Sequence, residues 1–196
     1  MVVGVFFDNS SGATTATFSC TNNGTFTQAG SFLAGTGGLA GGFQGMFYQL
    51  LTSSGADTCT LTPNASANLV WESAQYTFSG TFTGLDGAAT FAQVTASANV
   101  ATITATGPTS GTSDLVVATT INNSNGVTTT PGTGYTFRDD TSACEWFGSS
   151  CSTVGFNAYT GAGYEDKVNV AAGTPVATFN TVGATDLADI GLVSFH

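Results

Sequence analysis

The chain has almost no positive charge. Among its 196 residues only Arg138 and Lys167 are basic, against 12 acidic residues, so the formal net charge is -10. Nucleic-acid binding draws its affinity from clustered Lys and Arg side chains, and an anionic membrane surface repels an acidic protein. The composition therefore excludes most roles on nucleic acid or at a membrane surface, and we interpret the acidity as a source of solubility.

Histidine is nearly missing as well, because His196, the last residue, is the only one. A Ser or Cys nucleophile elsewhere in the chain would lack the imidazole base of a hydrolase triad. A zinc site is not expected either, since no C-x-x-C pair accompanies the single histidine. We predict from this that the protein is not an enzyme.

Long apolar runs and helical periodicity are also missing. No run approaches the ~18 residues of a membrane span, and residues 1–7 are too short and uncharged for a signal peptide, so we expect that an export signal has been removed. What is present is glycine, at 26 residues, with abundant Thr, Ser and Ala, a composition that favours strands and tight turns. The 41% of hydrophobic residues suffices for one core, and we predict a single domain over 1–196.

Four cysteines allow three pairings. We favour a bond between Cys20 and Cys59, which lie in Thr-rich, strand-like segments, and a second bond between Cys144 and Cys151, which closes a short loop. Disulfides predict an oxidising compartment, and hence an extracellular or cell-surface location. The alternative is four free, buried thiols.

The sequence matches itself at two similar offsets. Residues 2–15 match residues 116–129 at an offset of 114, and residues 45–55 match residues 163–173 at an offset of 118. Each half then closes with an apolar strand, at 69–78 and 187–195. We predict two pseudo-repeats, 2–78 and 116–195, joined by a connecting segment at 80–114.

Two such halves, each too small to bury its apolar face alone, predict an all-β, two-sheet β-sandwich of jelly-roll type with an internal duplication. Within the strand at 69–78, alternation places Val70, Ala74, Tyr76 and Phe78 on one face, and Leu69 and Trp71 on the other. Glu72 falls on the first, apolar face, and we expect it at the rim of the sandwich.

Several short motifs carry a resemblance to known proteins: VVGV at 2–5, FY at 47–48 before SG at 54–55, DLVV at 114–117, GYTFR at 134–138 and YEDKV at 164–168. On these motifs the chain resembles poorly characterised bacterial extracellular β-sandwich modules, jelly-roll or Ig-like, of secreted or surface proteins. The resemblance implies a fold and a compartment, and no activity.

Such modules usually carry another strand ahead of the position of Val2, and none is present here. A sheet that lacks a strand exposes an unpaired edge, which a neighbouring copy could fill to build a filament. The alternatives are that the numbering starts late and that this protein closes the edge in another way.

Few residues could carry catalysis. A glycosidase needs two carboxylates beside a cleft, and the three glutamates are Glu72, Glu145 and Glu165. Glu145 is beside Trp146 but lies in the small loop between Cys144 and Cys151. Lys167 follows Glu165 and Asp166, which would keep it protonated; it could form an intramolecular amide, although a solvent-facing ion pair is the favoured interpretation.

Two ligand sites were considered. A calcium ion could bind acidic residues expected on loops, namely Asp139, Asp140, Glu165 and Asp166. Trp146, Phe147 and Tyr159 could form an aromatic surface for a glycan or a protein partner, or could cap one end of the sandwich.

These observations predict a non-catalytic extracellular structural subunit or surface-adhesion module, which could polymerise into filaments by strand complementation. Its expected partners are copies of itself or a cell-surface polysaccharide, with no nucleic acid and no membrane insertion. A carbohydrate-binding module is the alternative, and a small acidic glycoside hydrolase comes third. No cofactor is expected apart from the calcium considered above.

Overall fold

The computed structural model describes residues 1–9, 11–78, 80–106, 109–111, 113–122, 131–141, 161–180 and 187–196. Over these residues the chain is built of β-strands, with a single short 3-10 turn, η1, at Gly37–Leu39 and no α-helix. The all-β class predicted from the sequence is confirmed. No helix in the described part of the chain has the length and apolar character needed to cross a membrane.

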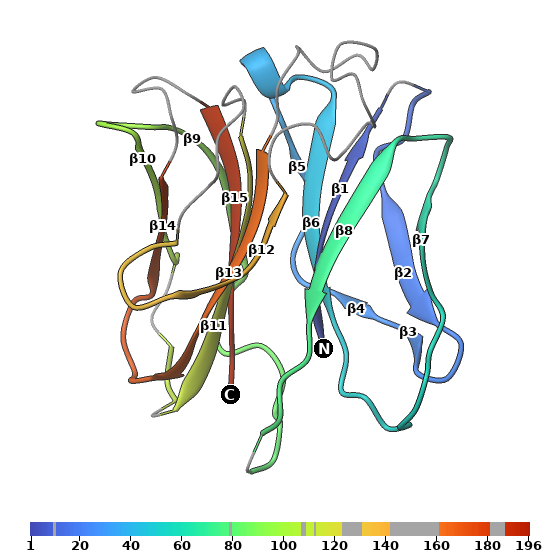
Figure 1. Ribbon diagram of the computed structural model, residues 1–196, viewed down its shortest axis with the longest axis vertical. Helices are drawn as coiled ribbons and strands as arrows, with labels where there is room; N and C mark the ends of the chain where they lie inside the picture. The colour runs from blue at the N-terminus through green and yellow to red at the C-terminus, as the bar shows by residue number, and fades with distance from the viewer. Residues whose placement is uncertain are drawn as a thin grey trace.

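The strands form four antiparallel sheets, which we name A to D (Figure 1). Sheet A has the order β4 (Thr27–Gln28), β6 (Gly42–Tyr48), β1 (Val2–Asp8), β8 (Leu69–Ala74), and β5 (Leu33–Ala34) also pairs with β6. Sheet B is β3 (Gly24–Thr25), β2 (Ala16–Cys20), β7 (Cys59–Pro63). Sheet C is β12 (Thr136–Thr141), β13 (Gly161–Val170), β11 (Asp114–Asn122), β15 (Leu187–Phe195), β9 (Thr90–Thr95), and sheet D pairs β10 (Val100–Thr104) with β14 (Val176–Asn180).

Apolar clusters connect these sheets in the order B, A, C, D, which Figure 1 shows from right to left. One cluster joins β1 and β6 to β2 and β7, and so packs sheet A on sheet B. A second joins β11 and β15 to β10 and β14, and so packs sheet C on sheet D. A third lies between β1 and β6 of sheet A and β11, β13 and β15 of sheet C. Sheets A and C are therefore covered on both faces.

This arrangement explains why β1 and β11 have no exposed face, although β11 also contains Asp114, Thr119, Thr120 and Asn122. Every residue of both strands is buried. On β1, Val3, Val5 and Phe7 point to sheet B, while Val2 packs with sheet C, because successive side chains of a strand point to opposite faces. At the centre, a Cβ on Gly4 would lie 2.6 Å from Cγ2 of Thr119, so only glycine allows the two sheets this close an approach.

Three expectations change in the light of these sheets. The described strands form four sheets where the sequence predicted two. Glu72 is 3% exposed, so its expected place at a rim is wrong. Strand β1 pairs with β6 on one side and β8 on the other, so sheet A is not open beside Val2, and among the described strands β8 is one of its two ends.

The alternation expected on β8 is otherwise confirmed in the described side chains. Ala74, Tyr76 and Phe78 pack into the cluster between sheets A and C, and Leu69 and Trp71 are exposed. The side chain of Val70 and residues 123–130 of the second pseudo-repeat lie outside the described part of the chain.

Candidate functional site

The aromatic surface and one cysteine pair expected from the sequence fall outside the described residues. They are Cys144, Cys151, Trp146, Phe147 and Tyr159, together with Glu145. The other pair is confirmed: Cys20 and Cys59 form a disulfide between β2 and β7, where they are direct partners in the strand register.

Glu165 lies inside β13 and is fully buried, not on a loop as expected. Its Oε2 accepts a hydrogen bond from the backbone N–H of Gly132 at 2.7 Å, and its Oε1 is buried with no hydrogen-bond partner in good geometry among the described residues. Burial disfavours the charged form and raises the pKa of Glu165 to about 8, with a smaller contribution from the charge of Asp166. The carboxyl group is therefore mostly protonated at neutral pH.

Asp166, the next residue of β13, is also buried and binds protein donors. Arg138 Nε donates to its Oδ2, Arg138 Nη2 donates to its Oδ1 at 3.0 Å, and the Tyr76 hydroxyl donates to Oδ2 at 2.8 Å. Tyr164 lies 3.3 Å from the Tyr76 hydroxyl. Burial raises the pKa of Tyr76, so this hydroxyl stays a donor. The hydrogen bonds of Asp166 thus connect β12, β13 and the segment after β8.

The remaining candidates for a calcium site or an amide bond are Asp139, Asp140 and Lys167. Asp139 and Asp140 belong to β12, but their side chains are outside the described part. Lys167 Nζ lies 5.7 Å from the centre of the Tyr135 ring, a cation–π contact, and within the described ranges it forms no ion pair.

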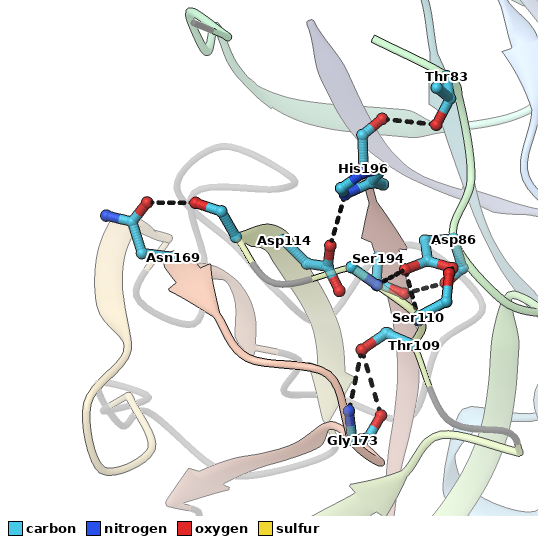
Figure 2. Close-up of polar contacts among 11 residues, drawn as sticks. Thr83, Asp86, Thr109, Ser110, Asp114, Asn169, Gly173, Ser194 and His196 are labelled. Carbon is cyan, nitrogen blue, oxygen red and sulfur yellow. Dashed lines mark hydrogen bonds and ion pairs between the residues drawn. The ribbon is translucent and has the colours of Figure 1, made fainter. Parts of the chain in front are cut away.

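A second polar cluster surrounds His196 (Figure 2). The imidazole Nδ1 lies 3.1 Å from Oδ1 of Asp114, whose side chain is fully buried, while that of His196 is 49% exposed. A Cβ on Gly111 would come within 1.7 Å of the same carboxylate oxygen, so glycine is required there. Local sequence patterns do not indicate this pair, because 82 positions separate the two residues.

The neighbouring hydroxyl groups in this cluster bind other partners. Ser110 Oγ donates to Asp86 Oδ1 at 2.9 Å, and the backbone N–H groups of Ser110 and Gly111 donate to Asp86 Oδ2. Ser194 Oγ donates to the Asp86 carbonyl. The hydrogen bonds from Gly111 and Ser110 to the carboxylate lower the pKa of Asp86, and the backbone N–H of Gly111 has the largest effect. The hydrogen bonds of this cluster connect the end of β15 to two loops. No serine drawn in Figure 2 is hydrogen-bonded to the imidazole of His196.

The described surface also contains a pocket of about 420 Å³. It lies where β1 begins and where β6 and β15 end, the end at which Figure 1 marks both termini. One wall is aromatic, with Tyr48, Tyr76, Phe78, Phe82 and Phe195. The lining also includes polar residues: Asn23, Gln49, Ser53, Ser54, Asp57 and Gln75.

Comparisons with protein-family models, curated proteins and solved structures found no match. Functional arguments for this chain therefore depend on its own residues.

The pocket could not be found from sequence patterns, because its walls come from five separate segments: residues 1–2, residues 20–23, residues 48–59, residues 75–82 and the end of β15. The one available signal was aromatic: Tyr76 and Phe78 continue the apolar face of β8 past the end of the strand. Polar residues after Tyr48, in contrast, look like an ordinary loop.

Proposed function

We propose that the protein is a non-catalytic extracellular structural or surface-adhesion subunit that associates with copies of itself through strand β8. The observation that supports this proposal best is the position of β8 at the edge of sheet A. Strand β8 pairs with β1 on one side, and no described strand pairs with its other side.

The exposed face of this edge is apolar. Leu69 is 37% exposed and Trp71 is 36% exposed, and the neighbouring Glu72 points inward. Proteins usually protect an edge strand with Lys, Pro or a covering segment, since its free N–H and C=O groups can pair with another chain. Addition of a strand from a second copy would satisfy those groups and cover both side chains, and head-to-tail repetition would build a filament.

The finer fold that we propose is a β-sandwich made by internal duplication. The offset of 114 maps β1 onto β11, and the offset of 118 maps β6, β7 and β8 onto β13, β14 and β15. The strand orders support this, because β6-β1-β8 in sheet A corresponds to β13-β11-β15 in sheet C. The two pseudo-repeats, 2–78 and 116–195, would then form one domain around the shared cluster between sheets A and C.

The extracellular location rests on the Cys20–Cys59 disulfide, since such bonds persist in oxidising compartments. The presence of only two basic residues, and therefore few sites for trypsin-like proteases, also suits a protein outside the cell.

The test is electron microscopy, with analytical ultracentrifugation, of the protein isolated from its native source without denaturant. Filaments or ordered sheets are expected, and Trp71→Lys and Leu69→Lys should each shift recombinant protein to monomers. Val168→Lys is the matched control, because Val168 is 54% exposed but lies on β13, inside sheet C. Dispersed monomers of the native protein at all concentrations would refute the proposal.

A further inference from the structure

The pocket at the end of the molecule has the size and construction of a small-molecule site. Its volume of about 420 Å³ falls within the range of roughly 300–1,000 Å³ that is usual for such sites. Its lining combines aromatic rings with polar side chains, which is the combination that fixes the orientation of a ligand.

The aromatic wall is rigid. The ring of Tyr48 packs edge-on against Phe195 at 5.2 Å between centroids and against Phe82 at 6.4 Å, and Phe82 contacts Phe78 at 5.1 Å. Phe195 is only 1% exposed and anchors the group in the core. Because each ring is held by its neighbours, little conformational entropy would be lost when a ligand stacks on this wall.

The polar side is also fixed before any ligand binds. The carboxylate of Asp57 accepts hydrogen bonds from Thr21 Oγ1 at 2.7 Å, from Asn22 N–H at 2.9 Å and from Asn23 Nδ2 at 2.7 Å. These bonds lower the pKa of Asp57 to about 2, so it remains an ionised acceptor. Asn23 Oδ1 in turn accepts from the backbone N–H groups of residues 52 and 53, and so holds the loop that carries Ser53 and Ser54.

The charges of the residues that line the pocket limit the chemical class of ligand that it can bind. Neither Arg138 nor Lys167 is among the residues that line the pocket. The α-amino group of Met1, which also lines the pocket, already donates to the Gln49 carbonyl at 2.9 Å, so a phosphate, sulfate or carboxylate group would meet the ionised Asp57 with no basic side chain to balance it. A neutral ligand with an apolar face and several hydroxyl groups matches both walls, and a sugar ring has this chemistry.

We propose that this pocket binds a neutral sugar unit. The apolar face of the ring stacks on the aromatic wall, and its hydroxyl groups donate to Asp57 and exchange hydrogen bonds with the amides of Gln49 and Gln75. This binding does not depend on assembly through β8, since the pocket and the β8 edge are formed by different side chains.

The experiment is saturation-transfer NMR with the full chain and four neutral sugars: glucose, galactose, mannose and N-acetylglucosamine, each at millimolar concentration. Transfer to at least one sugar is expected, and isothermal titration then gives its Kd. Ser54→Trp should weaken this binding at least ~10-fold by filling the pocket. Ser66→Trp is the matched control, because Ser66 is an exposed serine that does not line the pocket, and it should bind as the wild type does.

Three results would overturn the inference. No transfer to any of the four sugars would exclude the ligand class. Equal binding by wild type and Ser54→Trp, with Ser54→Trp shown to be folded by its circular dichroism, would place the sugar elsewhere. Binding of tetramethylammonium or inorganic phosphate at this pocket, without sugar binding, would assign it to a charged ligand.

Discussion

Replacement of Glu165 by glutamine should remove much of the pH dependence of stability in this protein. Burial raises the pKa of Glu165 to about 8 in the folded chain, whereas the ordinary value is 4.5. The folded state therefore holds a proton that the unfolded state releases between these two values. Stability is then greatest below the ordinary pKa and falls as the pH rises toward 8.

The size of the effect follows from the same two values. One pKa unit corresponds to about 1.36 kcal/mol, so the free energy of unfolding should fall by roughly 3 kcal/mol between about pH 5 and about pH 8. This is a large part of the roughly 5–15 kcal/mol that stabilises a typical domain. Glutamine keeps the shape and the acceptor for Gly132 N–H but carries no titrating proton. The variant should therefore be about 3 kcal/mol more stable than the wild type near pH 8.

The assay is urea unfolding, followed by tryptophan fluorescence, at several values between pH 5 and pH 8. Asp57→Asn is the control of opposite sign, because the pKa of Asp57 is lowered to about 2 and its contribution is lost only as the pH falls through that value. This variant should keep the wild-type slope above pH 5. Burial raises the pKa of Asp189 to about 6. The stability of Glu165→Gln should therefore still fall with pH, by a smaller amount, in the lower part of this pH range. Wild-type stability that is constant or rises from pH 6 to pH 8 would refute the reasoning.

Three further changes should lower stability for separate reasons. Gly4→Ala should cost about 1–3 kcal/mol in urea unfolding, since its Cβ would lie 2.6 Å from the facing strand of sheet C; an unchanged midpoint would mean that the sheets can separate there. Arg138→Met should cost about 2–3 kcal/mol at neutral pH, because it leaves the buried Asp166 carboxylate without its cation, and Lys167→Met, which breaks no ion pair in the described part, is the control. Cys59→Ser should cost about 2–4 kcal/mol by releasing the cross-link to Cys20, and reduction of the wild type should reproduce that loss, as thermal unfolding with and without reductant will show.

Local patterns were enough to predict the strands. The apolar runs at 2–8 and 114–122, and the alternation around Trp71, correspond to β1, β11 and β8. The Cys20–Cys59 pairing also followed from two strand-like segments. These features depend on neighbours within a few residues, and side-chain alternation is the same whatever covers the sheet.

Burial of the carboxylates could not be predicted, because it depends on how many sheets pack together. In a two-sheet fold each sheet has one face toward solvent, so Glu72 was expected at a rim and Glu165 with Asp166 on a loop. In the structure sheets A and C are both covered, and the same strands bury all three residues. The partners of Asp166 come from Arg138 and Tyr76, which lie 28 and 90 positions away.

The formal charge of -10 therefore overstates the charge on the surface. Of the eight acidic residues whose side chains the structure describes, six are buried, namely Asp8, Glu72, Asp114, Glu165, Asp166 and Asp189. A buried carboxyl group either finds a donor, as Asp166 does with Arg138 and Tyr76, or keeps its proton, as Glu165 does. With two basic side chains in the whole sequence, neutral donors and retained protons serve instead: Asp8 accepts hydrogen bonds from the backbone N–H and the Nδ2 of Asn68, and burial raises the pKa of Asp189 as it does that of Glu165. Acidic residues are thus part of the core as well as of the surface. Because buried carboxyl groups with raised pKa values stabilise the folded state only while they hold their protons, the protein should be more stable in mildly acidic than in alkaline solution.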